Sequence, residues 1–118
     1  METGYERAVV TLFCVADGTT SLYFSTGGGA IGCGQHASVA ALAKAFVIVA
    51  NTFLDQTKAV AEFPLPSVGR VRFYLRAFEG TRTWEALEDD LGNMRDPLSP
   101  LFHAGHRVIS AIRELGLI

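Results

Sequence analysis

The chain has 118 residues, of which 49% are hydrophobic and 19% charged, and its 10 basic and 12 acidic residues give a formal net charge of −2. This length fits one domain over residues 1–118, and the charge gives no reason to expect nucleic acid or an anionic membrane surface as a partner. Two cysteines are too few for a disulfide framework, and the polar N-terminus does not resemble a signal peptide. We therefore expect a cytoplasmic protein without a membrane span.

The first elements are predicted to be two antiparallel strands. Arg7–Ala16 is rich in β-branched, aromatic and aliphatic residues, Asp17-Gly18 supplies the residues of a tight turn, and Thr19–Ser25 returns as the second strand. A two-residue turn would place Leu22 opposite Phe13. Both faces of this hairpin are then largely apolar, which predicts that it is central and covered on both sides.

A glycine-rich loop, Gly27–Gly34, follows the hairpin. Its spacing satisfies the GxGxxG pattern of dinucleotide sites, but the strand before it is the return arm of a hairpin and not the first strand of a βαβ unit. Two interpretations remain: a connector that needs positive φ angles, or a small-ligand or anion site made by the amides ahead of the next helix. The residues of the second interpretation are Gly28, Gly29, Gly32, Cys33 and His36.

The longest apolar stretch is predicted to be a helix from Gln35 to about Ala61. Its apolar sector is wider than one sheet face needs, so we expect the helix to have a second neighbour. We expect this neighbour to be a second copy of the chain. The predicted interface residues are Lys44, Val47, Ile48 and Asn51.

Two more strands are predicted after the helix, Val68–Phe78 and Thr81–Glu88, joined by a turn at Glu79-Gly80. The second of them also fits a helical spacing. The polar side of the first carries three arginines and a tyrosine, an arrangement found on nucleic-acid platforms. Glu85 on the returning strand can form cross-strand ion pairs with these arginines, so we interpret this face as self-compensated and solvated.

An acidic loop, Glu88–Arg95, leads to a closing helix that begins after Ser99 as N-cap and ends at Leu115, with Gly116 behind it. The order ββαββα predicts an α+β domain. We expect a four-stranded antiparallel sheet with the long helix on one face and the closing helix on the other.

The cysteines and histidines allow two chemical hypotheses. Cys33 and His36 have a C-x-x-H spacing and could form a zinc site with His103 and His106 if the two helix ends converge. Cys33 beside a helix N-terminus could also act as a nucleophile with His36. One half-motif on a glycine-rich backbone is weak evidence for a zinc site, and no third group that would orient a nucleophile can be named. We therefore expect no catalytic residues, no metal and no cofactor.

The element order over Arg7–Leu115, two hairpins around one long helix with a closing helix, resembles the small longin, roadblock and profilin-like domains. The stretch Leu22–Gly29 also resembles a small bacterial family. The first resemblance implies a non-enzymatic module that dimerises through the long helix and the adjoining sheet edge. We therefore expect a homodimeric interaction or regulatory module, with ligand or anion binding by Gly27–Gly34 as the alternative.

Overall fold

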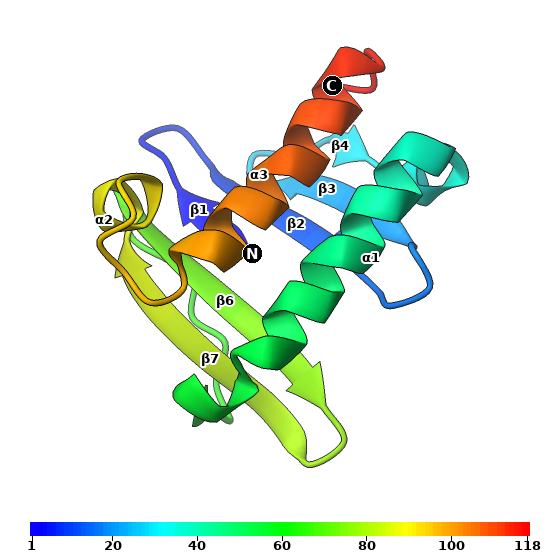
Figure 1. Cartoon of the computed structure of the whole chain (residues 1–118). Coiled ribbons are helices and arrows are strands. Elements are labelled where there is room, and N and C mark those ends of the chain that lie inside the picture. The colour runs from blue at the N-terminus through cyan, green and yellow to red at the C-terminus, as the bar shows by residue number, and fades with distance from the viewer.

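The computed structural model describes all residues, 1–118, and shows an antiparallel sheet with two long helices on one of its faces (Figure 1). The strands are β1 (Glu2–Gly4), β2 (Val9–Cys14), β3 (Thr20–Phe24), β4 (Gly29–Ala30), β5 (Lys58–Ala59), β6 (Arg70–Ala77) and β7 (Gly80–Leu87). The helices are α1 (Ala37–Thr52), α2 (Glu88–Gly92) and α3 (Ser99–Glu114), with 3₁₀ turns η1 (Cys33–Gln35) and η2 (Leu54–Gln56). None of these helices has the length and apolar character of a membrane-spanning segment.

The sheet has seven strands in the order β4-β3-β2-β1-β6-β7-β5, and every neighbouring pair is antiparallel. The α+β class is confirmed, but the predicted four-stranded sheet is wrong. The three strands that were not predicted, β1, β4 and β5, contain only two or three residues each. Such short strands show no alternation of apolar and polar residues that a sequence could reveal.

Both long helices lie on the same face of the sheet, so the prediction of one helix on each face is wrong (Figure 1). α1 and α3 contact each other along their lengths, and a Cβ on Gly105 of α3 would come within 3.2 Å of the Phe46 ring of α1. The missing side chain of Gly105 therefore permits a close helix–helix approach. The second neighbour that the wide apolar sector of α1 requires is thus α3 of the same chain.

α1 ends at Thr52 and not near Ala61 as predicted. The chain beyond it forms η2 and the edge strand β5, and Arg82 of β7 satisfies its backbone. The Arg82 Nε donates to the Leu54 carbonyl at 3.1 Å and to the Thr57 hydroxyl at 2.9 Å. The Arg82 side chain thus satisfies backbone carbonyls that would have accepted helical hydrogen bonds if α1 had continued.

The first hairpin pairs one residue out of the predicted register. The Val15 N–H donates to the Thr19 carbonyl and the Gly18 N–H donates to the Val15 carbonyl, both at 2.9 Å. This is a three-residue loop with Gly18 at φ 97°, where a two-residue turn was expected. Leu22 therefore lies opposite Leu12 and not Phe13. A shift of one residue exchanges the faces, so Leu12 and Leu22 point toward the helices.

The face of the sheet opposite the helices, called the outer face below, is only partly covered. Residues 60–67 cross it beside β6, where the Tyr74 hydroxyl donates to the Pro64 carbonyl at 2.6 Å and the Phe63 ring meets the Tyr74 ring edge-on. No helix covers the outer side of β2 and β3 (Figure 1). The prediction that the first hairpin is covered on both sides is therefore wrong.

The second hairpin agrees better with its prediction, because its register differs by two residues and the faces are kept. Ala77 pairs with Gly80, and Trp84 lies opposite Phe73 on the helix-covered face. The predicted cross-strand ion pair is present between Arg72 Nη2 and Glu85 Oε2 at 3.1 Å.

The segments after this hairpin are helical. The predicted loop Glu88–Arg95 contains the short helix α2. α3 starts at Ser99, which is its first residue with Leu98 as N-cap. Gly116, at φ 70°, follows its end as expected.

Candidate binding cleft

The sheet contains a gap in its middle. β1 lies between β2 and β6 and pairs with both, but it covers only residues 2–4. Met1 adds one more pair, since the Leu12 N–H donates to the Met1 carbonyl at 2.8 Å. β2 continues to Cys14 and β6 continues to Ala77 without a strand between them.

The gap forms a cleft of about 580 Å³, within the size range of small-ligand and peptide pockets. Fifteen of the nineteen residues that line it are hydrophobic, so the cleft is apolar. Phe46, Ala50 and Leu54 border it on the helix side, and Phe13 and Phe63 border it on the outer face. The cleft was not predicted from the sequence because β1, the strand that begins it, was not predicted.

A polar cluster lies beside the cleft on the outer face. The Thr11 hydroxyl donates to Glu2 Oε2 at 3.0 Å, while Glu2 Oε1 and Arg72 Nε are buried and have no hydrogen-bond partner. Burial raises the pKa of Tyr74, the charges of Glu2 and Glu85 raise it further, and Arg72 opposes this rise. The cluster offers one free acceptor and one free donor to a bound group, but no nucleophile paired with a base.

The four predicted interface residues occupy one side of α1. Val47 and Asn51 line the cleft, and Ile48 is 67% exposed. Lys44 extends over the β2–β3 loop, where its Cε would be 3.3 Å from a Cβ on Gly18. Two of these residues thus face the gap in the sheet and only Ile48 presents a large apolar surface to solvent.

The glycine-rich loop is a turn and a close packing contact. The Gly27 N–H donates to the Phe24 carbonyl and the Phe24 N–H donates to the Gly28 carbonyl. This is the same three-residue loop as at Gly18. A Cβ on Gly34 would lie 2.2 Å from the Gly18 carbonyl oxygen, so Gly34 lets the backbone of η1 rest on the first hairpin loop.

The proposed ligand residues are dispersed along this loop. Gly29 belongs to β4, Gly32 precedes η1, and Gly28 lies at the turn with no atom near its Cβ position. His36 is the N-cap of α1, is exposed and makes no side-chain capping bond. These residues do not converge on a common point in the structure.

Cys33 has the opposite of an activated environment. Its side chain is 1% exposed, its Sγ lies 3.6 Å from the Ala30 carbonyl oxygen, and burial raises the pKa of its thiol. Activated cysteines have a lowered pKa and partial exposure. Cys14, in the wall of the cleft, has its pKa raised to about 11, mainly by burial.

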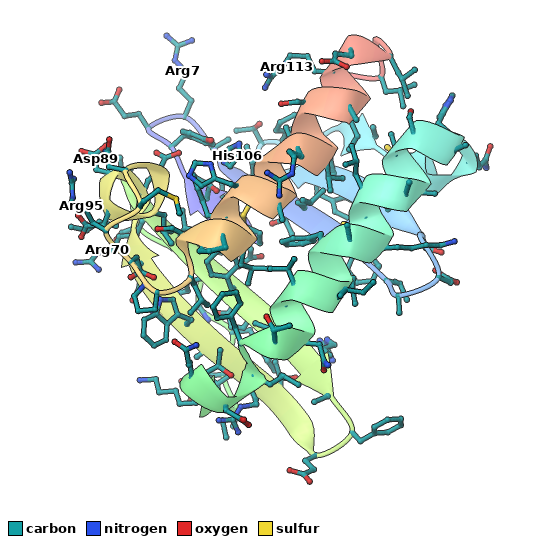
Figure 2. The ribbon with its side chains drawn as sticks, in the orientation of Figure 1. Arg7, Arg70, Asp89, Arg95, His106 and Arg113 are labelled. Atoms are coloured by element: carbon teal, nitrogen blue, oxygen red, sulfur yellow. The ribbon has the colours of Figure 1, made fainter.

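The histidines do not join the cysteines. No group of three or more histidine, cysteine, aspartate or glutamate side chains comes together to hold a metal ion. His103 and His106 lie on α3, and Figure 2 shows His106 projecting toward the side of the molecule where α2 lies. The ring of His106 lies 4.4 Å from that of Phe102, its Nε2 is buried without a partner, and burial lowers its pKa.

Comparisons of the chain with protein-family models, with curated proteins and with solved structures gave no match.

Proposed function

We propose that this protein is a non-enzymatic interaction module that forms a homodimer through the outer face of its sheet. One observation carries the proposal: Phe13, Val15 and Tyr23 are 46%, 38% and 43% exposed on the side of the sheet that no helix covers. Phe13 pairs with Ser21 and Tyr23 pairs with Thr11, so the two rings are diagonal neighbours on adjacent strands. They form one apolar patch, called the outer patch below.

The amount of surface supports this proposal. The chain exposes 6778 Å², whereas a monomer of 12.7 kDa is expected to expose about 6,200 Å². The outer patch itself contains no charged residue, so its three side chains can meet their copies across a two-fold axis without an opposing charge. Two free cysteines fit a reducing cytoplasm.

The interface is placed on the outer face and not on α1 for a physical reason. α3 occupies the apolar sector of α1, and Ile48 is the one large hydrophobic side chain that α1 leaves mainly exposed. A single exposed isoleucine is ordinary on a protein surface, whereas neighbouring aromatic side chains are typical of interfaces.

Sedimentation equilibrium of the wild-type chain and two matched variants tests the proposal. Tyr23→Arg places a charge in the outer patch, and Ile48→Arg places the same charge on α1. We expect the wild-type chain and Ile48→Arg to be dimers at about 10 μM and Tyr23→Arg to be a monomer, because burying an unpaired charge is costly.

Two results would contradict the proposal. The first is a wild-type chain that stays monomeric up to about 100 μM. Its Kd would then be weaker than that of specific dimers, and self-association would be ruled out. A monomeric Ile48→Arg variant beside a dimeric Tyr23→Arg variant moves the interface to α1.

A further inference from the structure

We infer that the two-fold axis of the dimer crosses the strands of the first hairpin, so that Tyr23 of each copy lies over Ser21 of the other. This inference rests on the proposed self-association through the outer patch and states how the two faces fit together. Its evidence is an alternation of large and small residues on the outer side of β2, β3 and β4. These three strands are consecutive at one end of the sheet (Figure 1).

The first row of this alternation crosses the strands at Ser21, which pairs with Phe13 on β2. On the other side of Ser21, β4 pairs with β3, and its residue Ala30 packs against the core. The next residue, Ile31, therefore lies beside Ser21 and points to the outer face. Ile31 is 81% exposed and Phe13 is 46% exposed, whereas Ser21 between them is 5% exposed. The row thus has two projecting side chains, with Ser21 as the floor of a narrow dip between them.

The second row has the opposite pattern. Tyr23 pairs with Thr11 on β2 and with Gly29 on β4, so its ring projects between a half-buried threonine and a glycine. A Cβ on Gly29 would lie 2.0 Å from the Leu22 carbonyl oxygen, so a side chain cannot fill this position. The glycine-rich loop thus gives the outer face both a projecting residue, Ile31, and an empty position, Gly29.

A two-fold axis that crosses the strands between the two rows places each row against the other row of the second copy. Tyr23 then lies over Ser21 and between the two projecting side chains that flank it. Ile31 lies over the empty position at Gly29. Two β-sheets that pack face to face interdigitate in this way, about 10 Å apart and with their strands nearly aligned.

A two-fold axis that runs along β3 would lose this fit. It would bring Ile31 against Phe13 of the second copy, and these are two large side chains. It would also leave Gly29 opposite Thr11, with empty space between them. Because the centre of a specific interface is packed as densely as a protein interior, the alternation favours the axis that crosses the strands.

The charges at the two ends of the hairpin agree with this axis. Since the axis exchanges residues 11 and 13 of β2, it also brings Val15 over Val9, and the loop after β2 over the loop before β2 of the second copy. The loop after β2 carries the exposed Asp17, and the loop before β2 carries the exposed Arg7, which projects from the molecule in Figure 2. This axis therefore gives Asp17 a cationic partner at each end of the interface, which favours one orientation of the two copies.

Mixing two variants tests the contact of Tyr23 with Ser21. Sedimentation equilibrium is run at about 10 μM on Ser21→Glu, on Tyr23→Arg and on an equimolar mixture of the two. Each variant alone places a charge against an uncharged residue at both contacts, so we expect each to be a monomer. In the mixture, one contact joins glutamate to arginine and the other keeps the wild-type pair. We expect a dimer with a Kd at least about tenfold lower than that of either variant alone.

Ile31→Ala and its matched control Ile48→Ala test the second contact, and they decide the matter if Ser21→Glu does not fold. Ile31 and Ile48 are 81% and 67% exposed in the single chain, so neither substitution removes a core contact. We expect Ile31→Ala to raise the Kd of the dimer about tenfold or more and Ile48→Ala to leave it within about twofold.

Two results would overturn the inference. The first is a mixture that associates no better than its components, and the second is an equal effect of the two alanine substitutions. Either result, beside a dimeric wild-type chain and a monomeric Tyr23→Arg variant, removes this arrangement and leaves association through the outer patch intact. A wild-type chain that stays monomeric removes both.

Discussion

Replacing Gly34 by alanine tests whether the glycine-rich loop packs closely against the β2–β3 loop. The new methyl group would lie 2.2 Å from the Gly18 carbonyl oxygen and 3.2 Å from the Thr19 Cα. These are backbone atoms, so the clash cannot be relieved by a side-chain rotation. Either η1 or the β2–β3 loop has to move by about 1 Å to restore van der Waals contact.

The magnitude follows from this geometry. Overpacking against a rigid neighbour costs about 1–3 kcal/mol, and a backbone contact this short belongs at the upper end of that range. The lower entropy of the unfolded chain returns about 0.4–1 kcal/mol. We therefore expect Gly34→Ala to lower the free energy of unfolding by about 2 kcal/mol.

Gly28→Ala is the matched control, because Gly28 lies in the same glycine-rich loop, Gly27–Gly34. Its φ is 83°, and a Cβ there would meet no atom within 4 Å. It therefore carries only left-handed strain of about 1–2 kcal/mol, offset by about 0.4–1 kcal/mol from the unfolded chain. Its net cost is expected to be about 1 kcal/mol.

Urea unfolding followed by Trp84 fluorescence gives both free energies, and unchanged m-values show that the unfolded states are comparable. Gly34→Ala is expected to melt about 4 °C below Gly28→Ala. Equal stabilities, or the reverse order, would refute the packing argument, since Gly34 would then not be pressed against the hairpin loop.

Three other predictions follow from named contacts. Asp96 Oδ1 accepts both the Trp84 indole N–H at 3.0 Å and the Leu98 N–H at 2.8 Å, so Asp96→Ala should lower the free energy of unfolding in urea by about 1–3 kcal/mol. The control Asp90→Ala breaks an exposed ion pair with Arg95 and should lower it by less than about 1 kcal/mol, so equal losses would refute the prediction. Burial lowers the pKa of His106 below 6.5, so the folded state binds fewer protons, and stability should fall as pH drops from about 7 to about 5; a His106→Gln variant with the same slope would contradict this. Burial raises the pKa of Cys14 to about 11, so its alkylation by iodoacetamide near pH 8 should be slower than that of a free thiol and should accelerate in urea, whereas a fast native rate would refute the buried placement.

Local sequence patterns were sufficient for the large elements. The alternation in Val68–Phe78 identified β6, and the Ser99-Pro100 start and Gly116 stop identified α3 to within a residue. The ion pair of Arg72 with Glu85 followed from the faces of two adjacent strands, which a register error of two residues does not change.

The first hairpin shows where such patterns fail. A two-residue and a three-residue loop are both compatible with Ala16-Asp17-Gly18, and the choice between them moves every side chain of the partner strand to the other face. The helix arrangement failed for a related reason. Periodicity showed that α1 needs a second neighbour but does not identify it, and α3 of the same chain meets that need as well as another copy would.

The candidate cleft could not be predicted from the sequence because β1 has no recognisable sequence pattern of its own. Glu2 and Thr3 look like a polar terminus, yet β1 pairs with β2 on one side and β6 on the other. Only the pairing of strands far apart in the sequence reveals that β2 and β6 continue past Met1 without a strand between them.

An isotope-filtered NOE experiment shows directly whether the face left bare by the helices is the face through which the protein associates. The sample is an equimolar mixture of labelled and unlabelled chains, in which only contacts between copies give filtered signals. We expect signals between the side chains of Phe13, Val15 and Tyr23 of one copy and the outer face of the other. Filtered signals from the Ile48 methyl groups alone, or no filtered signals at all, would contradict it.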